Sequence, residues 1–149
     1  MRLKQIARIV LATMGVVGFF VYIWKEQVAG GAKIAEMNSM FEAIRPVPGA
    51  FFLSSSARCK GASSGYLSYY YHDGQVNWPD IRRHYDGELR KHGWENVGKE
   101  KVPYLWRDYG GQVIRYRNSG YDALLYYEGN DPHYNWTFSL SFTWGSSAF

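Results

Sequence analysis

Few residues of this chain combine types and spacings that could do chemistry. His72 and Asp73 are adjacent, and any of many serines could complete a Ser/His/Asp triad around His72 or His133. Adjacency in the sequence is a poor guide, because the members of a triad meet in space and not along the chain. A small hydrolase built around one of these histidines therefore stays open as an alternative, with no residue assigned as catalytic.

The histidines and acidic residues also lack the spacing of a metal or cofactor site. His84 and His92 are eight residues apart, about 80° around a helix, and no His-x-x-x-His pair occurs. Asp108, Asp122 and Glu128 fall on expected strands, but no spacing selects two of them as the carboxyl pair of a glycosidase. We expect neither a metal ion nor a cofactor.

Polar and aromatic side chains on two expected strands favour a binding surface over a catalytic centre. Arg115 and Arg117 share one face of their strand, because side chains alternate between the two faces of a sheet. The tyrosines of neighbouring strands cannot all fit a core this small; they are Tyr66, Tyr70, Tyr116 and Tyr126. Tyrosine and arginine are enriched in protein interfaces. An ordinary solvated face of the same composition is the alternative. The residues predicted to bind a partner are Arg115, Tyr116, Arg117, Thr137, Ser139 and Ser141.

The distribution of charge and cysteine narrows the class of protein. The chain of 149 residues carries a net charge of +4, but residues 46–149 hold eleven cations and ten anions. A nearly neutral domain lacks the phosphate-neutralising charge that drives nucleic-acid binding, so no nucleic acid is expected as a partner. The single cysteine, Cys59, excludes an internal disulfide.

A long apolar segment precedes these elements. Residues 6–24 read IARIVLATMGVVGFFVYIW, with Arg8 as the only charge. At about 1.5 Å per residue, a helix of this length approaches the ~30 Å hydrocarbon core of a bilayer, and Tyr22 and Trp24 would fall at an interface. We expect a transmembrane helix whose partner is the lipid bilayer.

Charge predicts the orientation of this helix. Arg2, Lys4 and Arg8 come without an acidic residue, so the positive-inside rule places the N-terminus in the cytoplasm. The rest of a single-pass inner-membrane protein would then be periplasmic or extracellular. A cleaved signal peptide, with a site near Val28-Ala29-Gly30, is the alternative, and it also exports the domain.

The neck that follows, residues 25–45, is predicted to be a hinge and an amphipathic helix. Gly30 and Gly31 each cost about 1 kcal/mol against helix continuation, so we expect a hinge there. The apolar positions after it follow helical spacing and form one face, which docks either on the chain's own domain or on a second copy in a homo-oligomer. These positions are Met37, Met40, Phe41 and Ile44.

Residues 46–149 predict one exported α+β domain. Asn77 as a cap, Pro79 in the first turn and Gly93 after the end define a helix over residues 79–92. Strands are expected at 51–53, 66–71, 104–109, 112–117, 121–128 and 134–144, with the serine- and glycine-rich run 54–65 as a loop. The last strand alternates aromatic and small polar residues, which indicates one buried and one solvated face. We expect an antiparallel sheet of about five strands with the helix packed on one face.

Two patterns resemble a group of bacterial domains. Pro46-x-Pro48-Gly49, followed by a tyrosine-rich strand and Tyr85-x-x-x-Leu89-x-x-x-Gly93-Trp94, is similar to small exported or membrane-anchored domains, most of which have no assigned activity. The resemblance covers residues 46–95. It implies a compact α+β domain in a bacterial envelope and supplies no catalytic residue.

These observations predict a membrane-anchored periplasmic module that binds a protein or an envelope component without catalysis. An immunity protein that neutralises a periplasm-acting toxin is a concrete version of this function. A small envelope hydrolase is the alternative from another class. The predicted organisation is a cytoplasmic tip and anchor at 1–24, the neck at 25–45 and the exported domain at 46–149.

Overall fold

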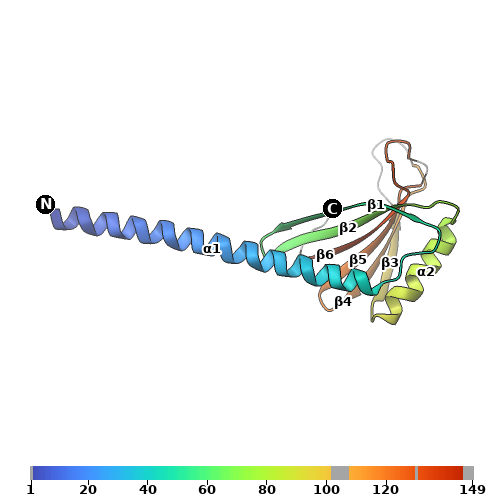
Figure 1. The fold of residues 1–149 in the computed structure, drawn as a ribbon, viewed down its shortest axis with the longest axis horizontal. Helices are drawn as coiled ribbons and strands as arrows, with labels where there is room; N and C mark the ends of the chain where they lie inside the picture. The colour runs from blue at the N-terminus through green and yellow to red at the C-terminus, as the bar shows by residue number, and fades with distance from the viewer. Residues whose placement is uncertain (1, 102–107, 130, 146–149) are drawn as a thin grey trace.

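The fold is a long helix joined to an antiparallel sheet that carries a second helix (Figure 1). The computed structural model describes residues 2–101, 108–129 and 131–145, and their side chains from Thr13 onward. The sheet has the strand order β1-β2-β6-β5-β4-β3, and every neighbouring pair is antiparallel. The elements are α1 (Arg2–Ala43), β1 (Phe51–Lys60), β2 (Ser64–His72), α2 (Trp78–Lys91), β3 (Glu95–Lys101), β4 (Gln112–Asn118), β5 (Tyr121–Tyr127) and β6 (Phe138–Trp144). The predicted α+β class is confirmed, with six strands instead of about five.

Helix α1 is unbroken through the neck, so the expected interruption at Gly30 and Gly31 is wrong. At about 1.5 Å per residue its 42 residues extend roughly 63 Å. Figure 1 shows the N-terminal half projecting away from the sheet and the C-terminal half lying along it. The large apolar side chains of the projecting half are exposed: Met14, Val16, Val17, Phe19, Phe20, Val21, Tyr22, Trp24 and Val28.

A close contact explains why Gly30 belongs in the helix. The tip of the β1–β2 hairpin packs against α1, and Glu26 accepts a hydrogen bond from the Ala62 amide at 2.9 Å. A Cβ on Gly30 would lie 2.5 Å from the Gly61 carbonyl oxygen and 2.8 Å from Cys59 Sγ. Glycine has a low helix propensity, but at position 30 the absence of a side chain allows the hairpin tip to come this close to the helix.

The C-terminal half of α1 forms one part of the core. Met37 and Ile44 are buried, and the Phe41 ring stacks on Tyr69 with centroids 3.4 Å apart. Met40 packs against the same cluster. This apolar face was expected to dock either on the chain's own domain or on a second copy. The structure shows it docked on the chain's own domain.

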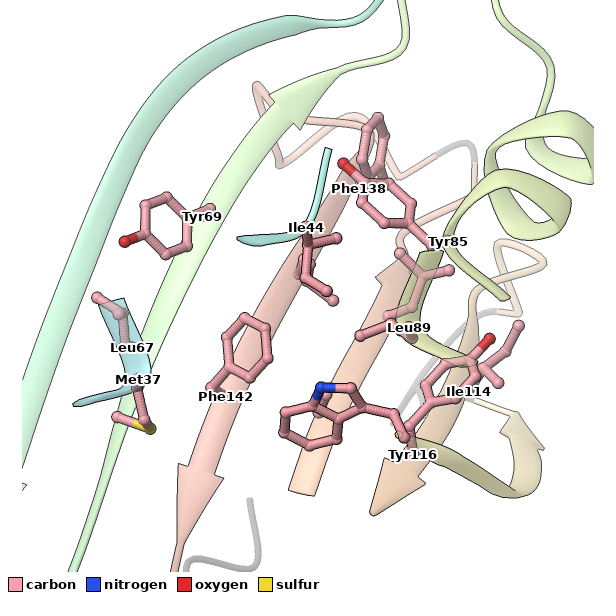
Figure 2. Packing of buried hydrophobic residues seen from close by; sticks show 14 of the residues in the cluster. Met37, Ile44, Leu67, Tyr69, Tyr85, Leu89, Ile114, Tyr116, Phe138 and Phe142 are labelled. Carbon is pink, nitrogen blue, oxygen red and sulfur yellow. The ribbon is translucent and has the colours of Figure 1, made fainter. Parts of the chain in front are cut away.

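Helix α2 forms the other part and is confirmed as predicted. The Asn77 side chain accepts from the Asp80 amide at 3.0 Å, and Gly93 takes the positive φ of 79° that ends the helix. Ile81, Tyr85 and Leu89 are buried against the sheet. Figure 2 shows Tyr85 beside Phe138, and Met37 and Ile44 on the same side of the sheet. Both helices thus cover the same face of the sheet, and neither helix covers the opposite face.

The two edge strands differ from the prediction, since β1 is longer than the strand expected at 51–53 and β3 was not expected. β1 continues to Lys60 through the serine-rich run expected as a loop, and β3 covers Glu95–Lys101, where no strand was expected. Almost every side chain in both strands is exposed, so neither shows the alternation that marks a half-buried strand. The expected strand at 104–109 lies outside the described residues except for Asp108 and Tyr109, which are in no strand.

The last strand differs from its prediction in length and burial. β6 begins at Phe138 instead of residue 134, and all seven of its residues are buried, so the expected solvated face is wrong. β6 lies third in the sheet, between β2 and β5, and longer side chains of these strands lie beside its small residues, such as Tyr70 and Tyr126 on either side of Ser139. Small polar residues here mark a recess and not an exposed surface.

In the part of the chain whose side chains are described, we find no helix with enough apolar length to cross a membrane. That part begins at Thr13, so residues 6–12 of the predicted anchor lie outside it.

The two neighbouring glycines of α1 give opposite predictions. Gly31 has no atom within 4 Å of an added Cβ, so Gly31→Ala should raise stability by up to about 1 kcal/mol through helix propensity. Gly30→Ala should lower it by about 1–3 kcal/mol, because the hairpin must move away. Denaturant unfolding of the detergent-solubilised chain measures both values. An increase in stability for both variants would show that the hairpin does not pack on α1 at Gly30.

A buried acid at the junction of the two helices predicts a dependence on pH. Arg45 and Lys91 bond to the Glu88 carboxylate at 2.9 and 2.6 Å, and these bonds lower the pKa of Glu88 from 4.5 to about 2. Because the folded pKa is depressed, the stabilisation is complete above pH 4.5 and is lost as pH falls toward 2. Thermal unfolding of Glu88→Gln should therefore show a lower midpoint at pH 7 and a smaller drop on acidification than the parent chain. The exposed Glu95→Gln is the matched control and should follow the parent curve.

Candidate binding site on the open face of the sheet

The face of the sheet opposite the helices is assembled by the strand register. Phe138, Leu140 and Phe142 point into the core, so Ser139 and Ser141 point to the open face. The register places Tyr70 and Tyr126 on either side of Ser139. Ser68 and Leu124 flank Ser141 in the same way. Ser139 thus lies between two long side chains, whereas Ser141 lies between Leu124 and another serine.

This arrangement creates a hollow of about 200 Å³, called here the serine hollow. Its lining comes from β2, β5, β6 and the segment that connects β5 to β6. The residues that line it are Tyr66, Ser68, Tyr70, Leu124, Tyr126, Glu128, Trp136, Ser139 and Ser141.

The floor of the serine hollow is small and internally bonded. Ser68, Ser139 and Ser141 are all buried. Ser141 Oγ donates to Ser68 Oγ at 2.7 Å, which links β6 to β2. A larger residue at these positions would fill the recess, so the depth of the hollow depends on serine.

Aromatic rings form the wall at one end. The Trp136 ring centroid lies 5.1 Å from that of Tyr70 and 6.3 Å from that of Tyr126, with interplanar angles of 59° and 62°. The ring centroid of Tyr134 lies 5.2 Å from that of Trp136. Tilted rings at these spacings present both faces and edges to whatever enters.

An acidic side chain lies at the same end. Glu128 follows β5 and is only 4% exposed. Its negative charge is the largest cause that raises the pKa of Tyr134. Burial chiefly raises the pKa of Tyr126, and the charge of Glu128 adds to it. The acid therefore acts electrostatically on two of the aromatic residues.

Of the six residues predicted as the binding surface, only Ser139 and Ser141 line the serine hollow. Thr137 lies at the end of the sheet, where its Oγ1 donates to Asp73 Oδ1 at 3.3 Å. Tyr116 is fully buried on the other face beneath α2, and its hydroxyl donates to Asp86 at 3.3 Å. Its assignment to the same surface as its neighbours contradicts strand alternation.

Arg115 and Arg117 do share the open face, but they form an ion-pair cluster beside the hollow. Arg115 Nη1 and Arg117 Nε each lie 2.9 Å from a carboxylate oxygen of Asp122 on β5. Burial acts to raise the pKa of Asp122, and the hydrogen bonds from Arg117 and Arg115 outweigh it, so the pKa is lowered. Both guanidinium groups are thereby held by a partner within the domain.

Three members of the hollow, Tyr66, Tyr70 and Tyr126, belong to the strand tyrosines that the sequence already indicated for a binding surface. Leu124 was missed, although it alternates with Tyr126 on β5, so alternation combined with the correct strand order would have found it. Trp136 lies before β6 in irregular backbone, and only the three-dimensional fold brings it to Tyr70.

The two histidines proposed for a hydrolase are exposed, and each lies beside an acidic residue. His72 Nδ1 accepts from the Gly74 amide at 3.1 Å and lies 3.3 Å from Asp73. His133 Nδ1 lies 2.7 Å from Asp131. Among the residues that the structure describes, no hydrogen bond joins a serine hydroxyl to either ring, and no cluster of acids, histidines or cysteine could hold a metal ion.

The spacing Gly-x-Ser-x-Gly occurs once, at residues 61–65. A nucleophile elbow is a strand-to-helix turn, whereas this segment is the tip of the β1–β2 hairpin. Ser63 Oγ donates to the Lys60 carbonyl at 2.6 Å. The segment therefore closes a hairpin and does not present a nucleophile.

A larger and more open cleft runs between α2 and β3. It is lined by Arg82, Arg83, Arg90 and Lys99, among others. Arg83 pairs with Asp80 and Arg90 pairs with Asp86. Its charge is therefore partly neutralised within α2, and the serine hollow remains the better-defined site.

No protein-family model matches the sequence, and neither a curated protein nor a solved structure is significantly similar to it. The functional assignment therefore depends on the geometry of the molecule itself.

Proposed function

We propose that this chain is a non-catalytic binding module, anchored in the inner membrane by residues 6–24 and facing the periplasm or cell exterior, that recognises a protein or envelope component. The observation that carries the binding role is the serine hollow, a recess with aromatic walls on the face that neither helix covers. Deep aromatic pockets with a polar rim are where interfaces concentrate their binding energy.

The projecting half of α1 supports the anchor. Phe19, Phe20 and Trp24 are each more than 60% exposed in the isolated chain. A helix that is apolar all round is stable when something covers it, and a bilayer covers every side at once. The sequence continues this apolar character back to Ile6, with the cations Arg2, Lys4 and Arg8 at the cytoplasmic end.

The anchor can be tested with a matched pair of variants in one helix. Val17→Lys with Phe20→Lys places two charges in the middle of the anchor, each costing about 2.5–3.5 kcal/mol to insert. The variant should leave the membrane fraction, whereas the parent chain stays there and loses its C-terminal domain to protease added outside spheroplasts. Ala35→Lys with Ser39→Lys, on the exposed side of the docked half, is the control and should remain membrane-bound. A parent chain found in the cytosolic fraction would refute the proposal.

The binding face can be tested by removing its aromatic wall. Trp136→Ala with Tyr126→Ala should abolish co-purification of a cross-linked envelope component with the full-length chain. The exposed aromatic Phe51, which lies outside the hollow, supplies the control variant Phe51→Ala. Circular dichroism verifies that both variants are folded. If the double variant and the control retain the same components as the parent, the serine hollow is not the binding site.

A further inference from the structure

Strand β3 presents a cation toward α2 and its acids toward the opposite face of the sheet. The register pairs Lys99 with Ile114, which is buried in the core on the helix side, so Lys99 lies on that side. Glu100 comes next and lies on the open face, where its carboxylate is 3.9 Å from Arg115 Nε. Glu95, by its register with β4, lies on the open face as well. The acids of β3 are therefore separated from the cleft between β3 and α2.

Helix α2 supplies a row of charged side chains to the same cleft. Arg82, Asp86 and Arg90 recur every four residues, so they lie along one flank of the helix. With Lys99 they line a cleft of about 540 Å³, which is called here the arginine cleft. Arg82 and Arg90 are eight residues apart, which is about 12 Å along the helix axis. Cations are thus spread along the cleft and come from both of its walls.

The acid of the arginine cleft is occupied by partners within the fold. Asp86 is the only acid among the described residues that line the cleft. Its Oδ1 accepts from the Asn96 amide and from the Tyr116 hydroxyl, each at 3.3 Å. Its Oδ2 lies 3.2 Å from Arg90 Nε. Asp86 therefore neutralises one arginine of the row.

Two cations of the cleft are accessible and uncompensated. Arg82 and Lys99 are exposed, and neither takes part in an ion pair within the described part of the chain. Residues 102–107, which follow β3, read VPYLWR and contain no acid. Arg83 pairs with Asp80, but its side chain is 78% exposed and its other N–H groups remain accessible. Four cations against two paired acids leave the cleft with a charge of +2.

We propose that the arginine cleft binds a linear anionic polymer of the cell envelope, whose phosphate or carboxylate groups pair with Arg82, Lys99 and the neighbouring arginines of α2. The planar guanidinium group bonds both oxygens of a carboxylate or phosphate, which makes arginine typical of such sites. This site is additional to the serine hollow, since it lies on the helix side of the sheet and shares no described lining residue with it.

The dimensions of the cleft favour a chain of anions over a single ion. Its volume of about 540 Å³ corresponds to roughly eighteen water molecules at liquid density, far more than one phosphate occupies. One small ion also cannot reach cations that are spread over about 12 Å of helix. A polymer with repeated anionic groups can contact several of these cations at once.

The position of the cleft in the fold argues against the headgroups of the protein's own membrane. Figure 1 shows α2 at the end of the sheet away from the projecting half of α1. If residues 6–24 span the bilayer, as proposed above, the arginine cleft lies far from the lipid surface. A polymer outside the membrane reaches this end of the domain, whereas headgroups of the same bilayer do not.

Titration calorimetry of the full-length chain in a non-ionic detergent tests the ligand. A short linear polyphosphate or an oligogalacturonate should bind at least tenfold more tightly than orthophosphate or glycerol phosphate, compared at equal concentrations of anionic groups. The tighter of the two polymers identifies the anionic group as phosphate or carboxylate. Added salt should weaken the binding, because the cations of the cleft are exposed.

A matched pair of double variants tests the location. Arg82→Gln with Lys99→Gln should weaken binding of the preferred polymer at least tenfold. Arg58→Gln with Lys60→Gln removes the same charge from exposed positions on β1, at the other edge of the sheet, and should change binding less than twofold. Circular dichroism verifies the fold of both variants, and Lys99→Gln alone keeps the test decisive if the first double variant fails to fold.

The outcomes separate this site from the serine hollow. Equal losses in the two double variants would show that only the net charge of the chain acts, and would overturn the arginine cleft. Equal affinity for the polymers and for orthophosphate, or tighter binding of an oligoglutamate peptide, would overturn the polymer as its ligand. Trp136→Ala with Tyr126→Ala should bind the polymer as the parent chain does, so the failure of one site does not imply the failure of the other.

Discussion

The docking of α1 onto the sheet is the contact on which the rest of the structure depends. Met37 and Ile44 are buried against strands that come later in the chain, and the Tyr121 hydroxyl donates to Glu36. Without this half of α1, the β1 and β2 side of the inner face would be open, since α2 lies against β3 and β5. One helix therefore completes the core and carries the projecting apolar segment.

Because both helices pack on one face of the sheet, the opposite, open face is available for binding. The strand order places β6 in the interior of the sheet, where Ser139 lies between Tyr70 of β2 and Tyr126 of β5. A sheet with uniform side chains would be flat there. The alternation of tall and short residues across the strands produces the recess, and no catalytic machinery is needed to explain it.

The sequence predicted those elements whose signals are local. Asn77 and Gly93 delimit α2 because capping is a property of neighbouring residues. Most of β1 and all of β3 were missed because an exposed edge strand has no buried face to impose a pattern. The serine hollow depends on strand order and on Trp136 meeting Tyr70, neither of which is encoded in local spacing.

The unbroken course of α1 changes what the neck can do. A hinge at Gly30 and Gly31 would let the domain swing freely relative to the anchor. The structure instead places Gly30 against the hairpin tip, and Glu26 bonds the Ala62 amide, so helix and sheet are joined at two further points beyond the core. A rigid connection of this kind fixes the direction of the helix relative to the sheet. If residues 6–24 span the bilayer, the serine hollow is then held at a set orientation and height above the membrane, and a partner must approach it from a restricted direction.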